Sequence, residues 1–190
     1  MPLSTLERRT HPRGGELAFF ESKIDGAKIR YGIWPARDQR QLGTVVVLPG
    51  RTEFIEKYYE VILELLQRGY AVAAMDWRGQ GLSHRPLPNR EKHYFDSFDD
   101  ALPDLAQLMD DHVKPTLPGP YSILAHSMGG HLSLRFLRDY PGYFDKAVVT
   151  APMVDIEFGK LPKLVTETLP KMMKHMGLGG KYAPGMDDYK

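Results

Sequence analysis

The feature that most constrains the fold is a repeated alternation of short apolar runs with segments of helical periodicity. The first run, Thr44–Leu48, reads TVVVL, which is typical of a strand buried on both faces. Three further runs have the same character: 70–75, 121–125 and 147–150. Apolar residues at helical spacing occupy three intervals around these runs: 54–66, 98–113 and 128–140. This order predicts an α/β fold with a mostly parallel sheet.

The boundaries of several elements also follow from local residues. Asp25-Gly26 separates two apolar stretches, 17–22 and 28–34, and predicts an antiparallel hairpin at the start of the fold. Thr52 is the expected N-cap of the first helix, and Gly69 its stop.

Composition excludes several classes of protein. The 190 residues are 42% hydrophobic, which is enough for a core, and the net charge of +1 lacks the basic excess of a nucleic-acid binder. The chain has no cysteine, so disulfides, thiolate metal sites and a cysteine nucleophile are excluded. The first 15 residues are polar, and no run approaches the roughly 20 apolar residues of a membrane span. We expect a soluble cytoplasmic domain.

A sharp turn from a predicted strand to a predicted helix contains the strongest candidate for a catalytic residue. Parallel sheets place their sites at the carboxyl ends of the strands, and the loop at 125–130 reads AHSMGG. Small residues, Ala125 and Gly129, stand two positions before and after Ser127, where larger side chains would collide at a tight turn. The pattern predicts a nucleophilic serine at a helix N-terminus. The alternative is a serine that only caps the helix.

Three separated segments together resemble one superfamily. LPGRTE at 48–53, DWRGQGLS at 76–83 and HSMGG at 126–130 follow successive predicted strands. In this order and spacing they resemble the α/β-hydrolases, and more narrowly the branch of serine hydrolases that includes lysophospholipases and monoacylglycerol lipases. APMVD at 151–155 also resembles that branch, so the similarity covers about 17–186. The implied fold is a mostly parallel sheet with an antiparallel N-terminal hairpin.

The resemblance implies roles for particular residues. Ser127 matches the nucleophile, and the backbone N–H groups of Met128 and Arg51 match the oxyanion hole. The family often has His-Gly where this chain has Pro49-Gly50. Because the donor is a main-chain group, this difference leaves its role intact.

Other residues of these segments are interpreted as structural. Asp76, Arg78 and Gly81 match a segment that shapes the loop beside the site, and Glu53 is expected to brace its loop rather than act as a base. A dinucleotide motif is disfavoured, because His84 stands where the third glycine of G-x-G-x-x-G belongs.

A serine nucleophile needs a base and an acid, which follow it in this fold in the order Ser, acid, His. After Ser127 only two histidines remain: His131 lies one turn along the same helix, and His175 lies in the last segment. Pairing of Asp155 with His175 is formally possible. The resemblance instead points to an acid and a histidine beyond residue 190. His126 has no triad role, and four histidines precede the nucleophile and match no triad position: His11, His84, His93 and His112.

The sheet leads to the same expectation. Six strands are predicted, whereas the fold normally adds two more strands with helices, or roughly 50–60 further residues. We therefore expect an N-terminal portion that lacks the last strands and helices. The predicted organisation is a loose arm at 1–15, the hydrolase core at 16–155 and the start of a cap at 156–190.

The last segment favours two interpretations equally. Seven apolar residues recur at helical spacing: Leu161, Leu164, Val165, Leu169, Met172, Met173 and Met176. They match the start of a lid over an acyl-chain pocket, or an amphipathic helix packed on the body. Six lysines face three acidic residues from 160 to 190, which suits contact with an anionic membrane surface or a solvated face.

The sequence thus predicts a hydrolase of carboxylic esters, of lysophospholipase or monoacylglycerol lipase type, that forms an acyl-enzyme on Ser127. This chemistry needs no metal or cofactor, and its partners would be small ester or lipid molecules and not nucleic acid. For lack of the acid and the histidine, the chain alone is expected to show little or no turnover. The alternatives are a non-catalytic remnant or lipid-binding module, and an acyltransferase on the same scaffold.

Overall fold

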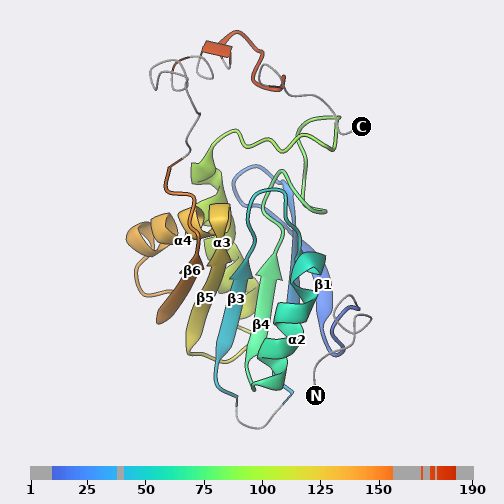
Figure 1. The fold of residues 1–190 in the computed structure, drawn as a ribbon, viewed down its shortest axis with the longest axis vertical. Helices are drawn as coiled ribbons and strands as arrows, with labels where there is room; N and C mark the ends of the chain where they lie inside the picture. The colour runs from blue at the N-terminus through green and yellow to red at the C-terminus, as the bar shows by residue number, and fades with distance from the viewer. Residues whose placement is uncertain (1–9, 38–40, 156–167, 169–171, 174, 183–190) are drawn as a thin grey trace.

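The computed structural model describes residues 10–37, 41–155, 168, 172–173 and 175–182. Six strands form one sheet in the order β1-β2-β4-β3-β5-β6 (Figure 1). The strands are β1 (Glu16–Glu21), β2 (Lys28–Trp34), β3 (Thr44–Leu48), β4 (Ala71–Met75), β5 (Tyr121–His126) and β6 (Lys146–Thr150). The helical elements are η1 (Ile55–Tyr58), α2 (Tyr59–Gln67), η2 (Phe98–Asp100), α3 (Ala101–Gln107), η3 (Leu108–Val113) and α4 (Ser127–Asp139).

The pairing of the strands confirms the predicted fold class. β4, β3, β5 and β6 are parallel, whereas β1 and β2 pair antiparallel to each other and β2 pairs antiparallel to β4. The predicted hairpin turn is present, with Gly26 at a φ of +74°, a left-handed conformation that glycine adopts without a steric cost. The carboxyl ends of the four parallel strands therefore meet at one edge of the sheet.

Alternate residues of the central strands point to opposite faces, and each face has its own helices. Val45 and Val47 of β3 pack with Ile62 of α2, while Val46 and Leu48 pack in a second cluster with helices α3 and α4. In Figure 1, α2 lies on one side of the sheet, and α3 with α4 lies on the other. The continuous apolar run that predicted a doubly buried strand is explained by these two layers.

Two predicted helix boundaries need correction. Thr52 is not an N-cap: its own backbone is left-handed, with a φ of +59°, and the helical segment begins instead with the 3-10 turn η1, which has no side-chain cap. The segment at 98–113 is not one helix but a 3-10 turn, an α-helix and a π-helical turn. The predicted stop is confirmed, since Gly69 follows the C-cap Arg68 with a φ of +92°.

The ends of the chain are described in part. Within the predicted arm, the His11 ring lies against Trp34 and Tyr59, and the Pro12 carbonyl accepts a hydrogen bond from Trp34 Nε1 at 3.1 Å. Most of the predicted cap falls outside the described residues, including Leu161, Leu164, Val165 and Leu169. The described residues contain no helix that is both long and apolar enough to span a membrane.

Candidate active site

Ser127 occupies a strained turn between β5 and α4. Its φ is +50°, in the left-handed region that a non-glycine residue seldom adopts. His126 before it is extended, and α4 begins at Ser127 itself. The chain thus reverses from strand to helix at a single residue, which is the elbow that the small residues at 125 and 129 predicted.

Close packing of backbone on backbone requires the glycine at position 129. A Cβ atom there would lie 2.3 Å from the Leu48 carbonyl oxygen and 2.5 Å from that of Pro49, far inside contact distance. Any side chain would push α4 away from the end of β3. At Gly130 the nearest atom is the side-chain Cγ1 of Val149, at 2.6 Å.

The side chain of Ser127 forms no hydrogen bond with the residues that the structure describes. It is half-buried, and its Oγ has no hydrogen-bonding partner in the described part of the chain. Only its main-chain carbonyl is engaged, since it accepts a hydrogen bond of 3.0 Å from Met153 N, in the loop after β6. The neighbouring His126 ring is instead hydrogen-bonded to Thr150 Oγ1 at 3.1 Å.

The loop after β3 lies directly against the elbow. A Cβ atom on Gly50 would lie 3.2 Å from Ser127 Cβ, so the glycine allows the two backbones to approach. The N–H of Arg51, the next residue, has no hydrogen-bond acceptor among the described residues. The N–H of Met128 lies in the first turn of α4, where amides have no intrahelical acceptor. One of these amides follows the serine in the chain, and the other lies in the loop that packs against it.

Gln80 braces the loop after β3, a role that the sequence analysis did not assign to it. Its buried side chain donates from Nε2 to the carbonyls of Gly50 and Glu53, both at 2.9 Å, and its Oε1 accepts from Thr52 N at 3.1 Å. One amide therefore satisfies three main-chain groups of a single loop. The only sequence signal was its position in the DWRGQGLS segment.

Glu53 is a second brace of the same loop. Its carboxylate accepts hydrogen bonds from Gly50 N at 2.7 Å and from the Tyr58 hydroxyl at 2.6 Å, and Lys57 Nζ lies at 3.2 Å. Burial opposes its ionisation, but these hydrogen bonds and the lysine hold the pKa of Glu53 below its ordinary value. An ionised, fully engaged carboxylate fits the expected bracing role.

The loop after β4 is wound around a buried carboxylate. Asp76 accepts hydrogen bonds from Ile55 N at 2.8 Å and Leu82 N at 2.9 Å, and Arg30 lies at 3.2 Å. Gly81 has a φ of +54°, and a Cβ there would lie 2.2 Å from the Asp76 carboxyl carbon. Asp76 and Gly81 therefore shape this loop together.

Arg78 joins the same loop to the rest of the body. Its guanidinium donates to both oxygens of the buried Asp104 in α3, at 2.7 and 3.1 Å. It also reaches Ser22 Oγ at 3.2 Å and Asp25 at 3.0 Å on the N-terminal hairpin. A single side chain thus connects three elements, which fits the structural role expected for it.

None of the described histidines is hydrogen-bonded to Ser127. The His131 ring packs edge-on against Phe98, with ring centroids 6.0 Å apart, and burial and the nearby Arg135 lower its pKa. His175 and Asp155 are described and lie in the segments that follow β6. Positions beyond 190, where an acid and a base were expected, are outside the chain that the structure describes.

A family model described as serine aminopeptidase, S33 (Hydrolase_4) matches residues 39–187. Lysophospholipase L2 of Escherichia coli K12 is 41% identical over 136 residues, which cover 70% of this chain and 38% of that protein. Monoacylglycerol lipase of Mycolicibacterium smegmatis is 31% identical over 168 residues, which cover 86% of this chain and 53% of the lipase. The chain therefore spans about half, or less, of the length of these relatives.

Solved structures share the fold. A thermostable carboxyl esterase from Bacillus coagulans superposes with a TM-score of 0.67 at 20% identity, over 87% of this chain and 52% of the esterase. A monoglyceride lipase variant from Saccharomyces cerevisiae gives 0.63 at 21% identity, over 85% and 52%. At this level of identity, the likeness shows the α/β-hydrolase fold alone.

Proposed function

The chain belongs to the Hydrolase_4 family of serine aminopeptidase S33-like hydrolases, and from this premise we propose that Ser127 is the nucleophile of a carboxylic ester hydrolase. The observation that carries the proposal is the Ser127 elbow. The serine sits in a left-handed conformation, its Oγ has no hydrogen bond to a described residue, and Gly50 lies against it. Strain at one residue with an unengaged nucleophilic atom is typical of a reactive serine.

The proposed reaction has two steps. Ser127 Oγ attacks the carbonyl carbon of the ester while its proton passes to a base, and the carbonyl oxygen becomes an oxyanion. The N–H groups of Arg51 and Met128 donate to that oxyanion. The ester C–O bond then breaks, the alcohol leaves with a proton, and the acyl group remains on Ser127. Water attacks this acyl-serine and releases the carboxylic acid and the free serine.

The substrate class in this proposal is an acyl ester of glycerol or of a glycerophospholipid. It rests on the names of two relatives, a lysophospholipase and a monoacylglycerol lipase, each at least 31% identical over the matched residues. Contact with a membrane surface through residues 156–190 is part of the same proposal.

We further propose that the 190-residue chain by itself shows little or no turnover. The reason is local: no described histidine is hydrogen-bonded to Ser127, so no described residue stands ready to take its proton. Removing the base of such a triad leaves only the contribution of the oxyanion hole and of binding.

The test is an ester-hydrolysis assay with 1-acyl-lysophosphatidylglycerol and 1-monoacylglycerol. It uses the 190-residue chain and the longest open reading frame that contains it, each with a Ser127→Ala variant. We expect turnover by the longer protein that falls by at least about a thousandfold in Ser127→Ala. Because Ser127 Oγ forms no hydrogen bond with a described residue, Ser127→Ala should change the free energy of unfolding by no more than about 0.5 kcal/mol from that of the unsubstituted chain. The Ser133→Ala variant, in the same helix, serves as the comparator and should retain turnover.

Turnover that survives Ser127→Ala would contradict the proposed nucleophile. Robust, Ser127-dependent turnover by the 190-residue chain would contradict the proposed inactivity and would make His175 the candidate base. Saturable binding of a fatty acyl ligand without cleavage in either protein would favour a lipid-binding module instead.

A further inference from the structure

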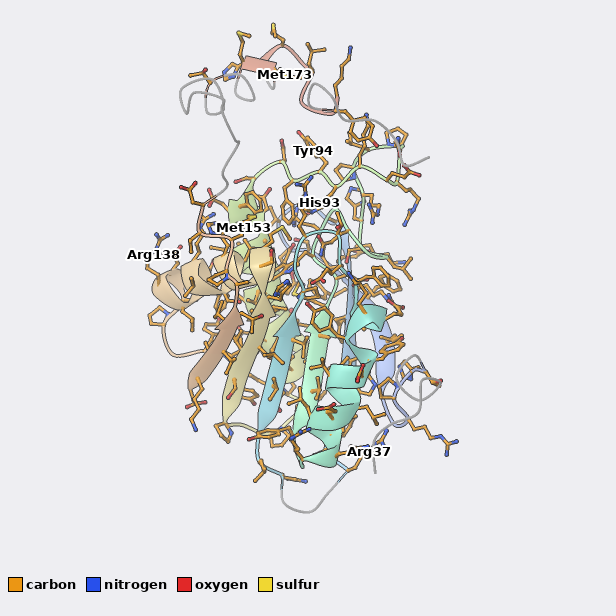
Figure 2. All side chains as sticks on the ribbon, in the orientation of Figure 1. Arg37, His93, Tyr94, Arg138, Met153 and Met173 are labelled. Carbon is orange, nitrogen blue, oxygen red and sulfur yellow. The ribbon has the colours of Figure 1, made fainter. Side chains whose placement is uncertain are left out.

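A basic cavity lies beside the loop that follows β3. It has a volume of about 200 Å³ and is lined by three segments: 51–52, 87–94 and 179–182. Figure 2 shows His93 and Tyr94 above the carboxyl ends of the strands, on the side of the sheet that faces the C-terminal segment. The cavity therefore joins the edge that carries the elbow to the last described residues of the chain.

The charge of the cavity is mostly positive. Arg51, Lys92 and Lys181 line it, against one lining carboxylate, Glu91. None of these three cations forms an ion pair with a described residue; Lys92 donates to the Gly180 carbonyl at 2.9 Å. Arg85, close enough to affect His93, donates only to main-chain carbonyls among the described residues. Cations without an ion-pair partner around one hollow favour an anionic ligand.

His93 adds a polar atom without a partner. Its Nε2 is buried and has no hydrogen bond among the described residues, which is rare for a buried polar atom. Burial, together with the positive charges of Arg51 and Arg85, lowers the pKa of His93 to about 4, so the ring is neutral at pH 7. A neutral imidazole protonated on Nε2 donates one hydrogen bond. The surrounding cations favour an anion as the acceptor of that bond.

The position of Arg51 relates the cavity to the proposed chemistry. Its backbone N–H follows Gly50, which lies against Ser127, while the residue lines the cavity with its charge close enough to lower the pKa of His93. A substrate whose ester meets the N–H of Arg51 would therefore have the cavity within reach of its alcohol part. In a lysophospholipid, that part is a glycerol unit that carries a phosphate.

We infer that this cavity binds the phosphate of a glycerophospholipid head group and so favours lysophospholipids over neutral monoacylglycerols. The guanidinium of Arg51 suits a phosphate because it donates two parallel hydrogen bonds, and the ammonium of Lys181 adds a charge-assisted one. The lipid source of the phosphate rests on the proposed function, whereas the anion site itself does not.

Binding to the full 190-residue chain tests the site without turnover. Calorimetric titration is carried out with glycerol 3-phosphate, inorganic phosphate and glycerol. We expect saturable binding of glycerol 3-phosphate, weaker binding of inorganic phosphate and none of glycerol. Arg51→Gln and Lys181→Ala should each weaken glycerol 3-phosphate binding about tenfold. Arg68→Gln and Lys146→Ala remove surface charges elsewhere, after α2 and on β6, and should leave it unchanged.

A spectroscopic readout locates the anion. When glycerol 3-phosphate binds, its charge favours the imidazolium form, so the pKa of His93 should rise from about 4, as followed by the NMR shift of the ring during a pH titration. Binding of glycerol 3-phosphate at a site far from His93 would leave the pKa of His93 unchanged.

Three results would overturn the inference: no saturable binding of glycerol 3-phosphate, binding unaffected by both Arg51→Gln and Lys181→Ala, or an unmoved His93 titration. Tighter binding of inorganic phosphate than of glycerol 3-phosphate would contradict the proposal that the phosphate belongs to a glycerophospholipid. These outcomes do not bear on Ser127, whose role fails only if hydrolysis survives Ser127→Ala.

Discussion

The two sides of the candidate site are positioned by different kinds of contact. On one side, the loops after β3 and β4 are held by buried polar groups such as Gln80, Asp76 and Arg78, each with several hydrogen bonds. On the other side, the elbow after β5 is held by the close approach of Gly129 to backbone oxygens. There the Oγ of Ser127, the proposed nucleophile, makes no hydrogen bond to a described residue.

The two kinds of contact distinguish groups that hold the fold from atoms that are available to bind a ligand. A buried polar group whose hydrogen bonds are all made contributes to a single rigid loop conformation, and removing it lowers stability. A polar atom with no hydrogen bond to a described residue, such as Ser127 Oγ or His93 Nε2, adds no hydrogen bond to stability and is available to a ligand. Substitutions on the two sides should therefore move different quantities.

The largest effect is expected from Arg78→Met. It leaves the Asp104 carboxylate buried without its partner, which typically costs about 3–5 kcal/mol of unfolding free energy. The matched control is Arg68→Met, which removes a surface pair with Glu64 and should cost about 0.5 kcal/mol or less. Urea unfolding at pH 7 measures both. Equal losses in the two variants would show that Arg78 does not act as a buried connector.

The elbow is tested by the same substitution at adjacent glycines. Gly129→Ala places a methyl group against the Leu48 carbonyl, a backbone atom that cannot move aside, and should cost about 1–3 kcal/mol. Gly130→Ala meets Val149 Cγ1 at 2.6 Å and Pro152 Cα at 3.2 Å; its shortest contact is with a side chain rather than with backbone, and the gain in helix propensity offsets part of the cost.

Thermal or urea unfolding of this pair should therefore show a larger loss for Gly129→Ala than for Gly130→Ala. If the order is reversed, backbone packing on the end of β3 does not hold the elbow.

A smaller loss is expected from Gln80→Met, which keeps the length of the side chain and removes its amide. The carbonyls of Gly50 and Glu53 and the N–H of Thr52 then lose a partner, at a cost of about 1–2 kcal/mol because part of the loop can be rehydrated. Gln107→Met is the control, since that amide also bonds two main-chain groups but at the surface. Similar losses in both variants would argue against a special role of the buried brace.

The smallest effect is a dependence of stability on pH through Glu53. Its pKa is lowered in the folded chain, so the unfolded chain binds the proton more readily. The stability it contributes is complete above its ordinary value of 4.5 and is lost as the pH falls through the lowered pKa. Glu53→Gln should flatten the unfolding free energy over that acidic range, with Glu21→Gln as a surface comparator. An unchanged profile in Glu53→Gln would contradict the bracing carboxylate.

Much of the fold was predictable because each signal was local. The β-branched run at 44–48 and the turn at Asp25-Gly26 depend on neighbours along the chain, and both elements are found where predicted. The elbow was predictable for the same reason, since the size limits at 125 and 129 apply within one turn. Thr52 was predicted wrongly because the loop after β3, to which the distant Gln80 is hydrogen-bonded, gives it a left-handed backbone, and the helical segment starts only at Ile55.

The sequence by itself determined the α/β class, the position of the elbow and the serine at its apex, since strand periodicity and small-residue spacing act over a few residues. Only the tertiary structure decided that Gln80 holds the loop against Ser127, that Arg78 connects three elements, and that Arg51, His93 and Lys181 share one cavity. These groups are far apart in the chain. Their hydrogen bonds and charges interact only after the parallel strands bring their carboxyl ends to a common edge.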